Sequence, residues 1–186
     1  MKLTALDLSL AHSGWAVYKD STEHWGTLTT SELAEPYADL ARLKRIVTEL
    51  GEIARGSDLV IVEGFAFARP QYAHQLGALG YLMRMWLWGH DLPFVVVAPK
   101  SNKKWCAGNG NAKKDLMLRE VTRRWNVVID DDNAADAYAL LKLGESLVGL
   151  QDFELTDFQR EVVHTIEEKQ KDRYEHLTLL ARPTAV

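Results

Sequence analysis

The sequence predicts an α/β domain with a mixed central β-sheet and helices on both faces of that sheet. Two observations support this fold class. In about the first thirty residues, apolar and polar side chains alternate with the two-residue period of strands. After that, segments with helical periodicity alternate with short apolar runs, which indicates strands joined by helical crossovers. A meander followed by alternating helices and strands gives a sheet with both antiparallel and parallel pairs.

The expected elements follow in chain order. Polar turns separate three strands at the start, and a helix follows in which apolar residues recur from Tyr37 to Ile53 before Gly56 ends it. The apolar runs DLVIVE and PFVVVAP are typical of buried strands. The expected ranges are strands at 3–10, 13–20, 24–30, 58–63 and 93–99, and helices at 37–53, about 71–89, 111–125 and 130–149.

The length of the chain is sufficient for one domain. With 186 residues and 47% hydrophobic residues, it can enclose one full core. We expect residues 1–150 to form the domain that contains the sheet. Residues 151–186, in which Phe158, Val162 and Ile166 recur at helical spacing, should add a helical extension to that domain.

Composition argues against a membrane or secreted protein. No stretch approaches the roughly 18–20 apolar residues of a membrane-spanning helix, and the N-terminus lacks the basic segment and apolar core of a signal peptide. Cys106 is the single cysteine, so no internal disulfide can form, and no Cys/His cluster has the spacing of a zinc site. We therefore expect a cytoplasmic protein.

The charge distribution matters more than its total. A net charge of −4 and a pI near 5.9 argue against nucleic-acid binding. The segment from Pro99 to Arg124, however, contains eight basic and only two acidic residues, which gives it a local charge of +6. This segment could be only a solvated helix face. The sequence GNGNA favours phosphate contacts instead, because its flexible backbone can approach a phosphate closely. The expected DNA contacts there are Lys103, Lys104, Asn109, Lys113 and Lys114.

Three acidic residues lie where this fold would bring them together. Asp7 and Glu63 interrupt apolar runs that look like buried strands, where an ionised carboxylate costs several kcal/mol unless a cation or a donor neutralises it. If the first strand lies beside the strand that ends at Glu63, the two carboxylates become neighbours. Asp136 follows on a helix, and Asp132 shares its face because it lies four residues earlier.

These acids are typical of a metal-dependent nuclease centre. Mg²⁺ is the expected ion, because it prefers a few carboxylate oxygens and retains waters that a phosphate can replace. Two ions about 4 Å apart could hold the attacking and leaving oxygens of an in-line phosphoryl displacement. Simpler interpretations exist for each acid. Asp132 could be only a helix cap, Asp136 a solvated residue, and Asp7 a strand-end carboxylate satisfied by donors.

These pieces, in this order, resemble the RuvC family of Holliday junction resolvases, which have the ribonuclease H-like fold. The opening LDLSLAHSGWAV is similar to the family's first strand and turn, with Asp7 at the first catalytic position, and IVEGFAF is similar to the strand that carries the second, at Glu63. KKWCAGNGNAKKDLM resembles the family's glycine-containing loop and basic helix, and NAADAYALL its final acidic helix. The resemblance covers about residues 3–148.

The resemblance implies further roles. Lys103 and Lys114 fall on the two lysines that the family places near the scissile phosphate and the catalytic centre. Many members carry Asp or His three residues before the final aspartate, and here that position is Asn133. We expect Asp132 to complete the metal site rather than Asn133, because a charged oxygen holds Mg²⁺ better than an amide. The viral relatives have a similar Asp-Asn arrangement, which suggests a phage-type member.

Aromatic residues follow the second acid directly. Phe65 and Phe67 lie in GFAFARPQY, and an aromatic beside a nuclease centre can stack on bases or wedge them apart. Core packing is the alternative, since alternating residues of an extended segment usually have one side buried. The same two interpretations hold for Trp105.

The helix expected at about 71–89 is apolar nearly all round, and Gly77 and Gly80 leave room for another helix. It is either a buried central helix or a dimer interface. The RuvC resemblance implies a homodimer, whose two-fold axis would match that of a four-way junction.

These observations predict a Mg²⁺-dependent endodeoxyribonuclease that makes paired cuts in four-way or branched DNA and leaves 5′-phosphate and 3′-hydroxyl ends. Mn²⁺ is expected to substitute for Mg²⁺, and a bacterial or phage-infected host cytoplasm is the expected location. A nuclease acting on RNA or hybrid and a non-catalytic junction-binding protein are the alternatives. An actin-like nucleotide-binding protein is disfavoured, because that fold needs two such domains.

Overall fold

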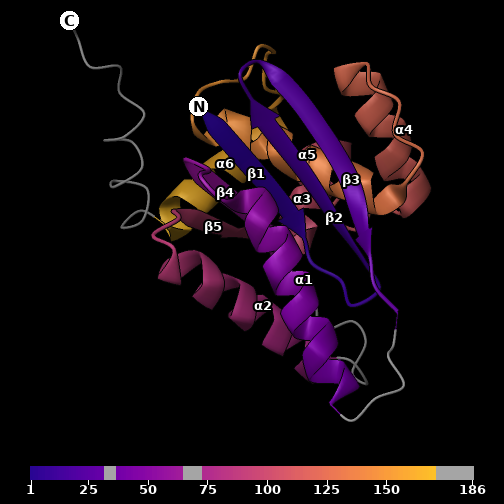
Figure 1. Cartoon of the computed structure of the whole chain (residues 1–186). Coiled ribbons are helices and arrows are strands. Elements are labelled where there is room, and N and C mark those ends of the chain that lie inside the picture. Colours follow the sequence, from indigo (N-terminus) through magenta and orange to yellow (C-terminus); the bar gives the residue numbers. More distant parts are fainter. Residues whose placement is uncertain (32–36, 65–72, 171–186) are drawn as a thin grey trace, which may run out of the picture.

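The computed structural model describes residues 1–31, 37–64 and 73–170. Its central sheet has five strands in the order β3-β2-β1-β4-β5 (Figure 1). The elements are β1 (Lys2–Asp7), β2 (His12–Lys19), β3 (Thr22–Thr29), α1 (Ala38–Ala54), β4 (Leu59–Glu63), α2 (Ala73–Gly89), β5 (Phe94–Val97), α3 (Pro99–Ala107), α4 (Lys114–Trp125), α5 (Asp132–Leu147) and α6 (Asp157–Lys169).

The strand pairing is mixed, as predicted. The meander pairs antiparallel, β1 with β2 and β2 with β3, whereas β1 with β4 and β4 with β5 are parallel. The expected neighbourhood of the first strand and DLVIVE is confirmed, with Leu6 opposite Val62 at the last register position. The sheet therefore places the ends of β1 and β4 side by side.

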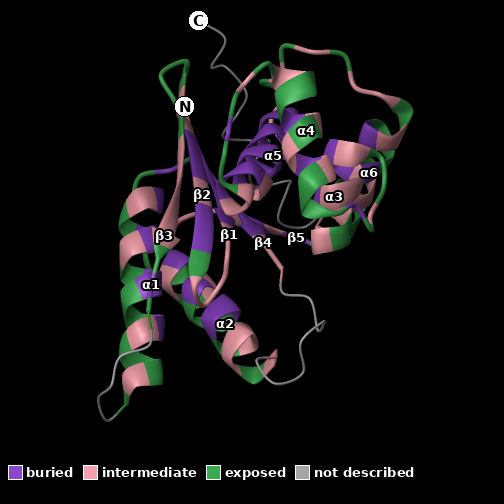
Figure 2. Cartoon of the chain, turned by 90° about the vertical axis from the view of Figure 1, so that its right-hand side faces the viewer, coloured by how far each residue is buried: buried purple, intermediate pink, exposed green. Residues whose placement is uncertain are grey.

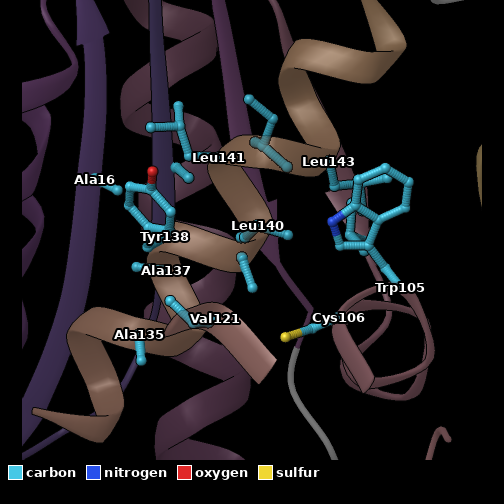
Figure 3. Packing of buried hydrophobic residues seen from close by; sticks show 14 of the residues in the cluster. Ala16, Trp105, Cys106, Val121, Ala135, Ala137, Tyr138, Leu140, Leu141 and Leu143 are labelled. Atoms are coloured by element: carbon cyan, nitrogen blue, oxygen red, sulfur yellow. The ribbon is translucent and has the colours of Figure 1, made fainter. Parts of the chain in front are cut away.

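Helices cover both faces of the sheet, and strand alternation divides the core between them. Leu3 and Ala5 of β1 pack into a core with α3, α4, α5 and α6, whereas Leu6 packs with α1 and α2 on the other face. Figure 2 shows the two groups of helices on opposite sides of the strands. Helix α5 is buried along most of its length, and Figure 3 shows its alanines, leucines and Tyr138 among the packed side chains.

Helix α3 is absent from the predicted order of elements. The sequence interpretation treated the lysines after PFVVVAP as flanks of a glycine loop, whereas residues from Pro99 to Ala107 are helical. Proline at the first helical position and a left-handed Gly108 (φ 72°) after the last are the local features that define this helix. The helix is short and rich in lysine, so its sequence lacks a clear helical repeat of apolar residues.

Helix α6 lies in the expected C-terminal extension, of which residues 171–186 are outside the described ranges. A capping box between Thr156 and Gln159 starts the helix. Val162 and Ile166 are buried in the same core as α5. No helix within the described ranges is long and apolar enough to span a membrane.

Candidate active site

The ends of two parallel strands build one side of the candidate site. Asp7 ends β1 and Glu63 ends β4. Side chains alternate along each strand, and Ala5 and Ile61, two residues before these acids, both pack in the core that contains α5. Asp7 and Glu63 therefore share the face of the sheet that α5 covers, close enough for the charge of Asp7 to raise the pKa of Glu63.

Helix α5 supplies the other side of the site. Asp7 pairs with Gly14 across the β1–β2 ladder. A Cβ added at Gly14 would lie 2.0 Å from the Asn133 carbonyl oxygen, so the first turn of α5 packs directly on the strand backbone. This close approach places Asp136 near enough to Asp7 for their charges to interact. Asp7, Glu63 and Asp136 therefore lie within electrostatic reach of one another, and their role as metal ligands stays a prediction.

Burial and nearby acidic charges disfavour the ionised forms of Asp7, Glu63 and Asp136. Burial, and next the charge of Asp7, raise the pKa of Glu63 well above its ordinary value. Burial also raises the pKa of Asp7. The pKa of Asp136 rises to about 7, chiefly through burial and then through the charge of Asp7. A cation between these carboxylates would relieve the repulsion and favour their ionised forms.

The donor set fits a hard divalent cation. Asp136 Oδ1 is buried and has no hydrogen-bond partner among the described residues, which leaves it available as a ligand oxygen. Across the same described ranges, no group of three or more His, Cys, Asp or Glu side chains is placed so that it could hold a metal ion without rearrangement. Side-chain adjustment on binding is therefore part of any metal assignment here.

Asp132 lies at the rim of the site and does not cap α5. The cap is Asp131, whose carboxylate accepts from the backbone nitrogens of Asn133 (3.0 Å) and Ala134 (2.9 Å) and from Thr27 Oγ1 (2.6 Å). The helix-cap alternative for Asp132 is therefore wrong by one position. Asp132 instead forms an ion pair with Lys114. The hydrogen bond to Asp132 raises the pKa of Lys114.

The Asn133 side chain belongs to the capping cluster. Its amide nitrogen lies 3.4 Å from Asp131 Oδ1 and 3.3 Å from Asp132 Oδ1. Its NH₂ group therefore faces these two carboxylates, and only its Oδ1 atom could serve as a metal ligand. The preference for Asp132 over Asn133 as a fourth ligand stays a prediction.

The predicted DNA-binding residues on and around α3 and α4 divide into three groups. Lys103 and Lys114 lie close enough to the acids to lower the pKa of Asp136. Lys104 instead points to α6, where its Nζ lies 2.6 Å from Glu161 Oε1. Asn109 and Lys113 are exposed in the segment between α3 and α4, and Asn109 Oδ1 accepts from the backbone of Asn111 at 2.9 Å.

The aromatic predictions have different outcomes. Phe65 and Phe67 lie outside the described residues. Trp105 is completely buried in the α5 core, which settles its role as core packing.

Sequence reasoning missed Asn102. This α3 residue is 1% exposed, and its Nδ2 donates to Glu63 Oε1 at 3.1 Å and to the Asp136 carbonyl oxygen at 3.0 Å. A polar residue spaced three and four positions before Trp105 and Cys106 would have indicated it, had α3 been recognised.

Comparison with curated proteins finds RuvC proteins as relatives of this chain. No family model matches the chain. The crossover junction endodeoxyribonuclease RuvC of Synechococcus sp. (strain CC9902) is 29% identical over 150 residues, which cover 77% of this chain and 97% of that protein. RuvC of Chlamydia trachomatis serovar L2 is 27% identical over 132 residues, covering 67% of this chain and 78% of the relative. The chain is thus a distant homologue of these proteins.

Solved structures show the fold. Thermus thermophilus RuvC matches with a TM-score of 0.61 at 18% identity, and the match covers 92% of this chain and 97% of the RuvC chain. The same enzyme in complex with Holliday junction substrate has a TM-score of 0.61 at 19% identity, covering 81% and 97%. Together with the 3-2-1-4-5 strand order, these matches confirm the ribonuclease H-like fold.

Proposed function

We propose that this chain is a Holliday junction resolvase, a crossover junction endodeoxyribonuclease that makes paired, metal-dependent cuts in four-way or branched DNA. The observation that carries the proposal is the meeting of Asp7, Glu63 and Asp136 at one end of the sheet beside Lys103 and Lys114. Distant homology to RuvC proteins supports the choice of substrate. The nuclease domain would comprise residues 1–150, with 151–186 as its helical extension.

The acids would hold the metal. Asp7, Glu63 and Asp136 would be the inner ligands and Asp132 the fourth, for Mg²⁺ or Mn²⁺ and for two ions in all. When bound, such ions activate water and stabilise the charge on the leaving oxygen. The ionised carboxylates that these ions require are the forms that burial now disfavours. Metal binding and deprotonation of the acids are therefore coupled.

The lysines would hold the DNA backbone. Lys114 is two-thirds exposed while paired with Asp132, so its ammonium can reach a phosphate without leaving a buried position. Lys103 would contact the scissile phosphate region from α3. Lys104, Lys113 and Asn109 would add backbone contacts that carry no base specificity. Cleavage would leave 5′-phosphate and 3′-hydroxyl ends.

Paired cuts require two active sites, and α2 offers a surface for a homodimer. Four large apolar side chains are exposed at helical spacing on α2, namely Tyr81, Leu82, Met85 and Trp88. Apolar residues on one helix face are typical of an isologous interface. A phage-type origin and a cytoplasmic location in a bacterium or infected host remain predictions from the sequence.

Cleavage of synthetic four-way DNA junctions tests the proposal. Wild type should nick opposite strands symmetrically with Mg²⁺ and not with EDTA, and Glu63→Gln should bind the junction without cutting it. Glu49→Gln, a surface change on α1, is the matched control and should cut normally. Stronger cleavage of an RNA–DNA hybrid would support the ribonuclease alternative. Tight junction binding without any cleavage would support the non-catalytic one.

A further inference from the structure

We infer that Asn102 is a positioning residue of the candidate metal centre, which holds the Glu63 carboxylate in place relative to α5. The inference rests on the proposed function, because Glu63 must be a metal ligand for its orientation to matter. Asn102 lies where three elements meet. From α3, its Nδ2 donates to Glu63 Oε1 at the end of β4 (3.1 Å) and to the Asp136 carbonyl oxygen on α5 (3.0 Å).

Packing alone does not explain an amide at this position. Asn102 shares the inward face of α3 with Trp105 and Cys106, and both of these residues are fully buried. An apolar side chain would suit such a face. The Asn102 Oδ1 atom is buried without a hydrogen-bond partner among the described residues, an arrangement that costs about 1–3 kcal/mol. A group kept in place at such a cost points to function rather than to stability.

The chemistry of its partners fixes the orientation of this amide. A carboxylate oxygen and a backbone carbonyl both accept hydrogen bonds, so only the NH₂ group can face them. Turning the amide over would set Oδ1 against two acceptors. The two amide hydrogens therefore tie Glu63 to the backbone of Asp136, a residue that itself carries a candidate ligand.

This link restricts Glu63 in the way that outer residues orient ligands in metal sites. Without it, the glutamate would be free to rotate about its own side-chain bonds, and the metal would have to order it on binding. A purely structural role, in which Asn102 only joins α3 to α5, is the competing explanation. The two differ in what they predict for metal affinity.

The experiment measures Mn²⁺ binding by titration calorimetry and thermal unfolding in EDTA. Asn102→Leu retains the branched shape of the side chain and removes both donors. Cys106→Ala alters the same face of α3 without contacting Glu63, and serves as the matched control. We expect Asn102→Leu to weaken Mn²⁺ binding about 10- to 100-fold, with no loss of metal-free thermal stability. Asn102→Ser, which retains one donor, should recover part of the affinity, and Cys106→Ala should bind Mn²⁺ like wild type.

Two results would overturn the inference. One is wild-type Mn²⁺ affinity in Asn102→Leu, and the other is an equal loss of affinity in Cys106→Ala. The variant Glu63→Gln distinguishes failure of the positioning role of Asn102 from failure of the proposed function. If Glu63→Gln weakens Mn²⁺ binding and Asn102→Leu does not, only the positioning role is wrong. If Glu63→Gln also binds Mn²⁺ like wild type, the proposed metal centre is wrong. The positioning role of Asn102 is then wrong as well.

Discussion

Gly14 on β2 lies directly beneath the carbonyl group of Asn133 on α5, so that a Cβ at Gly14 would approach that oxygen to 2.0 Å. The same glycine pairs with Asp7 on β1. One missing side chain thus allows the acidic helix to rest on the strand backbone beside the first acid. The distance between Asp7 and Asp136 depends on this contact.

Gly14→Ala should therefore shift the first turn of α5 away from the sheet. Overpacking of this kind costs typically about 1–3 kcal/mol of unfolding free energy, which denaturant titration would measure. Junction cleavage should fall more than stability does, because Asp136 moves with the helix. Gly89→Ala is the control, since a Cβ there would meet no heavy atom within 4 Å among the described residues. Full activity in Gly14→Ala would contradict this dependence.

Single substitutions can distinguish the roles of Asp132 and Asn133 in the candidate metal site. Asp132→Asn should reduce Mg²⁺-dependent cleavage by more than about tenfold, since even residues that only orient a metal ligand contribute that much. Asn133→Ala should have a small effect, because the Asn133 amide lies against Asp131 and Asp132. Cleavage rates at several Mg²⁺ concentrations would check both. Unchanged cleavage by Asp132→Asn would remove Asp132 from the ligand set.

The lysines of α3 should contribute unequally to DNA binding. Lys103→Ala should weaken junction binding and reduce the slope of log affinity against log salt by about one, as expected when one phosphate contact is lost. Lys104→Ala should change the slope less, because Glu161 already neutralises Lys104 at 2.6 Å. Fluorescence anisotropy over a salt series would measure both slopes. A larger change of slope in Lys104→Ala than in Lys103→Ala would show that DNA displaces Glu161 from Lys104.

The exposed apolar residues of α2 predict that two copies of the chain associate through this helix. Met85 is 65% exposed in the single chain, between Tyr81 and Trp88 on the same helix face. Met85→Glu should place a charge in the proposed dimer interface and give monomers in sedimentation velocity. Val128→Glu makes the same change at an exposed residue outside the helices and should leave the dimer intact. A wild-type monomer at micromolar concentration, with and without junction, would exclude the proposed homodimer.

A buried charge cluster between α5 and β3 should make stability depend on pH. Lys142 Nζ lies 2.9 Å from Glu145 Oε2 and also pairs with Glu23. Burial raises the pKa of Glu145 to about 7 despite the attraction of Lys142, and Tyr138 and Glu23 face the same cluster. Because the folded state holds this proton more tightly than the unfolded state, the contribution to stability is complete below the unfolded pKa. It is lost as pH rises through about 7.

Glu145→Gln removes this titration. Relative to wild type, the variant should gain stability on going from pH 5 to pH 8, by about 1–3 kcal/mol in urea unfolding. Glu49→Gln, at an exposed pair on α1, should show no such trend. Equal pH dependence in wild type and Glu145→Gln would contradict the raised pKa.

The sequence by itself determined the positions of the strands, the mixed character of the sheet and the faces on which the acids lie. Strand alternation commits Asp7 and Glu63 to the same face as Ala5 and Ile61, and helical spacing commits Asp132 and Asp136 to one side of α5. These are local rules of backbone geometry, so they hold whatever the rest of the chain does. The same periodicities located the five strands but did not fix their full order in the sheet.

Only the tertiary structure decided which side chains meet across the sequence. Asp131 rather than Asp132 caps α5, because Thr27 of β3 also reaches Asp131. Lys104 turns to Glu161, which lies 57 residues away. Asn102 reaches Glu63 and Asp136 because α3 packs against the end of β4 and α5. Such contacts depend on close approach between packed elements, and no local periodicity records them.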